Sequence, residues 1–181
     1  MLGLAAACFP DRDNDHYGAN HNQTIATDGI PDLLYEAKIG TDYIIQAYEK
    51  ADSVADMITS IGNFSSDHSW WGSPEYQDGK SQNRGGPIRE ARNEVGANIL
   101  GDFSAGLAFV GKLYKPYDQQ YVEKCLLVSQ KLYEYAKVHQ ITTESPAYNG
   151  NATVNDELAF AALGLLWATE DSKYLQDLAF D

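Results

Sequence analysis

The chain has 181 residues, of which 44% are hydrophobic and 12% aromatic, a length and composition that suit one domain spanning residues 1–181 and exclude a disordered tail. With 26 acidic and 13 basic residues the net charge is −13, a field that repels phosphate backbones and anionic lipids and so argues against nucleic-acid and membrane partners. Neutral polysaccharides, small neutral ligands and cations remain as ligand classes.

The first residues, 1–9, are apolar but have no basic region before them, so they are predicted to belong to a core helix and not to a signal peptide. Residues 10–28 are polar and are predicted to form a loop. Cys8 and Cys125 both lie in apolar helical patterns, which predicts two buried free thiols. A disulfide between them would require Cα atoms within about 7 Å, and the sequence leaves that open.

A helix is predicted to begin at Asp28-Gly29-Ile30-Pro31-Asp32, because a proline in the first turn and acidic side chains at the positive end of the helix dipole favour a helix start. Its apolar face runs to about residue 51 and comprises Leu33, Leu34, Ala37, Ile44, Ile45 and Tyr48. A less regular helix is predicted over 52–61. Residues 62–93 are predicted to form a long loop, and loops of that length in compact domains are usually functional or mobile.

Three clearer helical patterns follow, separated by a break at 115–118 and a polar loop at 140–153. Their apolar faces comprise Ile99, Leu100, Phe103, Leu107, Val110 and Tyr114; then Tyr121, Cys125, Val128, Leu132, Tyr135 and His139; then Leu158, Ala161, Ala162, Leu165 and Leu166. A last short helix is predicted to start at 171–172. No window alternates as a strand does, so the fold is predicted to be all-α. Long loops between paired helices favour a toroid or helical hairpin array over an up-down bundle.

The segment 66–75, Ser-Asp-His-Ser-Trp-Trp-Gly-Ser-Pro-Glu, places a histidine, two tryptophans and two carboxylates in a stretch with no helical or strand period. A sugar ring stacks its axial C–H groups on an aromatic face and pairs its hydroxyls with polar groups around that face. The alternative is that one or both tryptophans belong to the core, because Trp is mostly buried on average. The Gly/Ser/Pro setting is typical of a loop, where binding residues concentrate, and favours the sugar interpretation.

Three motifs resemble, in order and spacing, those of glycoside hydrolase family 9. Residues 29–37, Gly-Ile-Pro-Asp-Leu-Leu-Tyr-Glu-Ala, resemble that family's GIPDLLDEA helix start. Residues 67–75 resemble its DHxxWxxPE loop, and residues 155–158 with 167–175 resemble its DELxWAAxWLYxATxDxxYL block. The resemblance extends over nearly the whole chain.

The resemblance implies part of an (α/α)6 toroid, a secreted protein, and inverting hydrolysis of β-1,4-glucan by two carboxylates that need no cofactor. The family's Asp-Ala-Gly-Asp base segment and its late Glu acid do not occur in this sequence, so we expect an internal part of a catalytic domain. Asp67 and Glu75 flank the loop and are the candidate catalytic acids in this chain. The alternative is a non-catalytic carbohydrate-binding or assembly subunit.

The resemblance also implies sugar contacts from His68, Trp71 and Tyr148, with cello-oligosaccharide as the partner. Asn151 stands where the family has a further stacking tryptophan. Cutting a closed toroid would expose apolar helix faces, so we expect a homo-oligomer that buries them.

A structural calcium ion is implied at Asp156 and Glu157, together with the backbone carbonyls of Ala152 and Thr153, because calcium prefers several oxygen ligands. The alternative is an ordinary acidic first helical turn, which the helix dipole stabilises.

Overall fold

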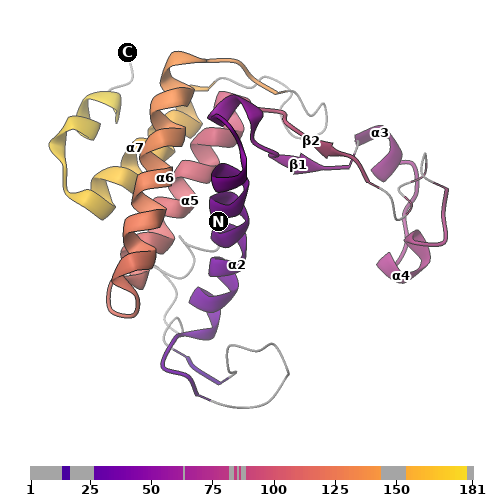
Figure 1. Ribbon diagram of the computed structural model, residues 1–181, viewed down its shortest axis with the longest axis horizontal. Coiled ribbons are helices and arrows are strands. Elements are labelled where there is room, and N and C mark those ends of the chain that lie inside the picture. The colour runs from indigo at the N-terminus through magenta and orange to yellow at the C-terminus, as the bar shows by residue number, and fades with distance from the viewer. Residues whose placement is uncertain are drawn as a thin grey trace.

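The computed structural model describes residues 14–16, 27–62, 64–81, 84, 86, 89–143 and 154–178. Within these residues the helical body consists of α2 (Asp32–Lys50), α5 (Ala97–Tyr114), α6 (Gln119–Val138) and α7 (Asn155–Thr169). The shorter elements are η1 (Val54–Asp56), β1 (Ser60–Ile61), α3 (Phe64–Asp67), α4 (Pro74–Gln77), β2 (Ala91–Arg92) and η3 (Ser172–Leu178). α5 packs against both α6 and α7, and α2 lies against α5 and α6 (Figure 1). The prediction of a mostly helical array is confirmed.

Helix α5 forms the centre of the body because its apolar residues cover more than one face. Leu100 and Leu107 are completely buried, and Val110 is 2% exposed. The interface with α6 also holds a polar pair: the Ser104 hydroxyl donates to the carbonyl of Ser129 at 2.9 Å, and the Ser129 hydroxyl donates to the carbonyl of Ser104 at 2.8 Å. Each buried hydroxyl thus has a partner, which removes the cost of burying it.

Helix α2 begins at Asp32, inside the predicted start segment 28–32, and the residues before it form a turn held by the Asp15 side chain. The Asp15 carboxylate accepts hydrogen bonds from the backbone amides of Gly29 at 2.7 Å and Asp28 at 3.2 Å. Gly29 has φ +87°, a conformation that residues with a Cβ rarely adopt. The turn therefore ends at Pro31, from which the helix continues.

The prediction of a helix over 52–61 is wrong. Ala51 is extended and ends α2, only the short 3-10 helix η1 follows, and residues 60–61 then form strand β1. This strand pairs antiparallel with β2, with Ser60 opposite Arg92 and Ile61 opposite Ala91. The conformation of this segment is determined by pairing with residues about 30 positions later in the chain, and not by its own helical pattern. The long loop predicted over 62–93 is interrupted by α3, α4 and β2.

Cys125 is a buried free thiol, as predicted, while Cys8 lies outside the described residues. Burial raises the pKa of the Cys125 thiol to about 12, so it stays protonated. None of the helices in the described part of the chain is long and apolar enough to cross a membrane.

Candidate functional site

The predicted sugar-binding loop lies at the far end of an arm that projects from the helical body. Strands β1 and β2 form the arm, and the segment with α3 and α4 lies beyond it (Figure 1). The base of the arm is fixed by Glu94, whose carboxylate accepts from the Ser60 hydroxyl at 3.0 Å and pairs with Arg92. The Thr59 hydroxyl also donates to the Glu94 carbonyl at 3.0 Å. A polar cluster therefore stabilises the arm where it leaves the helical body.

The two tryptophans of the loop have different environments. The Trp71 side chain is 97% exposed, so it is not a core residue. Trp70 is half-buried, and the Lys80 ammonium nitrogen lies 4.9 Å from the centroid of its ring. His68 is exposed in the turn that follows α3. The loop thus presents an uncovered indole face with an imidazole close by in the sequence.

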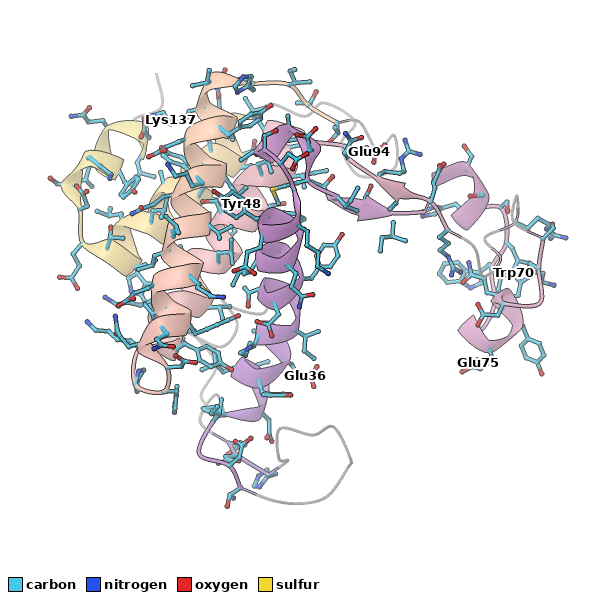
Figure 2. All side chains as sticks on the ribbon, in the orientation of Figure 1. Glu36, Tyr48, Trp70, Glu75, Glu94 and Lys137 are labelled. Atoms are coloured by element: carbon cyan, nitrogen blue, oxygen red, sulfur yellow. The ribbon has the colours of Figure 1, made fainter. Side chains whose placement is uncertain are left out.

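The two candidate acids, Asp67 and Glu75, flank these aromatic residues in the sequence. Glu75 is fully exposed in the first turn of α4, and Figure 2 labels it, like Trp70, in the segment at the tip of the arm. A hydrogen bond with the Ser73 side chain holds the pKa of Glu75 below its ordinary value, so this group is a carboxylate at neutral pH. Such a group can accept a proton or a hydrogen bond but is a poor acid. Asp67 is the last residue of α3, and its side chain lies outside the described set.

The predicted calcium ligands belong to a different part of the molecule, since Asp156 and Glu157 occupy the first turn of α7 in the helical body. The Glu157 Oε2 atom is buried and has no hydrogen-bond partner. Burial raises the pKa of Glu157 to about 7, and the adjacent Asp156 adds to the shift. An orphaned carboxylate oxygen suits a cation. However, no group of three or more His, Cys, Asp or Glu side chains is arranged to hold a metal within the described residues.

Three further predicted site residues, Tyr148, Ala152 and Thr153, lie outside the described residues. The structure therefore places His68 and Trp71 together on the arm and Asp156 with Glu157 on the body. These two groups do not form one site.

A groove of about 640 Å³ between α2, α5 and α7 was not predicted. It is mostly apolar, and its lining includes Ala37, Gly40, Phe103, Gly106 and Phe160. Asp102 also borders it; burial raises the pKa of this carboxyl, and the charge of Asp156 adds to the effect. The available sequence signal was Asp102 itself, an acid within an otherwise apolar stretch of α5.

Curated proteins that are similar to this chain include several endoglucanases. Endoglucanase 16 of Arabidopsis thaliana is 26% identical over 99% of this chain and 39% of its own length. Endoglucanase 19 of Arabidopsis thaliana is 30% identical over 78% of this chain and 22% of its own length. The chain thus spans well under half of these relatives.

Among solved structures, the cellulase Cel9M of C. cellulolyticum superposes with a TM-score of 0.63 and 29% identity, over 81% of this chain and 33% of that one. The same cellulase has also been solved in complex with cellobiose. The endoglucanase of the termite Nasutitermes takasagoensis superposes with a TM-score of 0.59 at 24% identity, over 80% of this chain and 37% of that one, which supports the fold. The helical body therefore corresponds to about a third of an (α/α)6 barrel.

The sequence profile described as Glycosyl hydrolase family 9 matches residues 1–181. The chain therefore belongs to glycoside hydrolase family 9.

Proposed function

We propose that this chain supplies part of the substrate site of a β-1,4-glucan hydrolase and that the segment from Ser66 to Glu75 binds the glucan. The observation that carries the proposal is the indole of Trp71, which is 97% exposed in a loop with the family's DHxxWxxPE pattern. A sugar ring that covers this indole would remove apolar surface from water, which is favourable. The cellobiose complex of the related Cel9M supports a cello-oligosaccharide as that ligand.

The chemistry of the loop suits a neutral sugar. Trp71 offers a flat apolar face, while His68 and the Glu75 carboxylate offer hydrogen-bonding groups in the same segment. If a pyranose ring covers about 80 Å² of apolar surface, the stacking contributes about 2 kcal/mol. That free energy corresponds to roughly a thirtyfold change in affinity.

Affinity electrophoresis in gels that contain hydroxyethyl cellulose tests the binding. The native chain should be retarded, and Trp71→Ala should lose most of the retardation. Tyr117→Ala is the matched control, because Tyr117 is also an exposed aromatic residue (42%) but lies between α5 and α6. Equal retardation of native chain and Trp71→Ala would refute the proposal.

Hydrolysis is a separate question, because it requires two carboxylates whereas binding requires the aromatic face alone. Reducing-sugar release from carboxymethyl-cellulose should be measured for the native chain, Asp67→Asn and Glu75→Gln. Product that disappears in either variant would assign that carboxylate a catalytic role. Retardation without product would support the second candidate, a carbohydrate-binding subunit, because the exposed Trp71 alone is enough for binding.

We also propose a calcium ion at the start of α7, supported by the buried, unpartnered Oε2 of Glu157. Binding to the folded state alone raises stability by mass action. Millimolar calcium should therefore raise the melting temperature relative to EDTA, and Asp156→Asn should abolish the difference. The same melting temperature in calcium and in EDTA would exclude the site.

A further inference from the structure

The ring of Trp70 folds back over the backbone of Gly72. A Cβ built on Gly72 would stand 2.5 Å from Cη2 of Trp70 and still closer to Cζ2, so a side chain at this position would displace the ring from where it lies. The Lys80 ammonium covers the same ring at 4.9 Å from its centroid. Cation–π contacts at this distance are favourable. Trp70 is thus contacted by Gly72, which precedes α4, and by Lys80, which follows it.

This arrangement constrains the neighbouring Trp71. The Trp70 ring occupies the space beside Gly72, and α4 starts two residues later at Pro74, so a change in the backbone between them would break this contact. Trp71 is left pointing into solvent, 97% exposed, although a second apolar ring lies next to it in the sequence. Without the contact, the two indoles could collapse onto each other and hide the apolar face.

We propose that Trp70, Gly72 and Lys80 form a latch that holds Trp71 in its binding orientation, an inference that rests on the proposed sugar binding by Trp71. Trp70 and Lys80 are positioning residues here and do not themselves contact the glucan. A side chain that is already ordered before binding loses less conformational freedom when the ligand arrives. The latch therefore raises affinity without adding any contact to the sugar.

The first test measures the latch without a ligand. In a Trp71→Phe/Trp167→Phe background, Trp70 is the remaining tryptophan, because the chain contains three. Acrylamide quenching of its fluorescence should increase at least twofold when Gly72→Ala is added. Gly79→Ala is the matched control, since a Cβ there meets its nearest neighbour, the Tyr76 carbonyl oxygen, at an ordinary 3.6 Å. Equal quenching in the two glycine variants would overturn the latch.

The second test measures binding in the chain with its native tryptophans, by affinity electrophoresis in hydroxyethyl cellulose. Gly72→Ala and Lys80→Met should each weaken retardation by about three- to tenfold, while Gly79→Ala should leave it unchanged. The far-UV circular dichroism should be the same in all variants, because the loop lies beyond the arm and away from the helical body (Figure 1).

The outcomes distinguish a failure of the latch from a failure of sugar binding by Trp71. Native retardation in Gly72→Ala and Lys80→Met, with retardation lost in Trp71→Ala, would overturn the latch and leave the proposed function intact. Native retardation in Trp71→Ala would overturn the proposed function, and with it the latch as a binding device.

Discussion

Helices α5 and α7 approach each other closely at Gly101, and this approach can be tested by adding a single methyl group. A Cβ at Gly101 would lie 2.8 Å from the carbonyl carbon, the carbonyl oxygen and the Cβ of Glu157. Gly106 belongs to the same helix but faces the groove, where an added Cβ would meet nothing within 4 Å. Gly101→Ala and Gly106→Ala therefore make the same chemical change in one helix, with and without a close neighbour.

The expected magnitudes follow from two opposing terms. Replacing a helical glycine by alanine stabilises by about 1 kcal/mol, because alanine loses less backbone entropy on folding. At Gly106 that gain is unopposed, so the free energy of unfolding should rise by about 0.5–1 kcal/mol. At Gly101 the methyl group must displace backbone atoms of α7, and overpacking of this kind costs about 1–3 kcal/mol or more. After the helical gain is subtracted, Gly101→Ala should therefore be up to about 2 kcal/mol less stable than the native chain.

Urea denaturation followed by far-UV circular dichroism measures these differences. The slope of unfolding free energy against urea should stay constant, since neither change alters the surface exposed on unfolding. Gly164→Ala gives an intermediate case, because its Cβ would lie 3.3 Å from the backbone of Ala105. Gly101→Ala with a stability equal to or above that of Gly106→Ala would refute the close crossing of α5 and α7.

Three further predictions concern strain, pH and assembly. Glu170, the residue after α7, has φ +61°, and its carboxylate pairs with Lys112 while 83% exposed. Glu170→Gly should therefore stabilise by about 0.5–1 kcal/mol in thermal unfolding, whereas Glu170→Ala should not. Burial raises the pKa of Glu157 from 4.5 to about 7, so its contribution to stability is complete below pH 4.5 and is lost as the pH rises through 7. In EDTA the free energy of unfolding of the native chain should therefore fall by about 1–2 kcal/mol between pH 5 and 8, as measured by urea unfolding. This is about half of what the pKa shift implies for a fully buried group, because Glu157 is partly exposed, and Glu157→Gln should remove the decrease. Exposed apolar side chains on α7, among them Leu163 and Trp167 at 47% and 38%, should lead to a dimer or higher oligomer in light scattering at micromolar concentration, and a monomer there would contradict this prediction.

The long helices could be predicted from the sequence because each has an apolar face that recurs with the helical period. Leu34, Ala37, Ile44 and Ile45 are buried on α2, and Cys125, Val128 and Leu132 are buried on α6, as the pattern requires. The loop with Trp71 could also be predicted, since its residue types are unusual and the order of its residues matches a known family motif. Such features depend on residues that are near one another in the chain, so local patterns record them.

What only the tertiary structure decided involves residues that are far apart in sequence. Strands β1 and β2 contain two residues each, too few for any alternation to show, and each exists because the other lies beside it. The groove beside Asp102, the raised pKa of Glu157 and the contact of Gly101 with α7 all arise where separate helices meet. Burial depends on which helix faces pack together. The sequence shows which faces are apolar, but it does not show which of them meet.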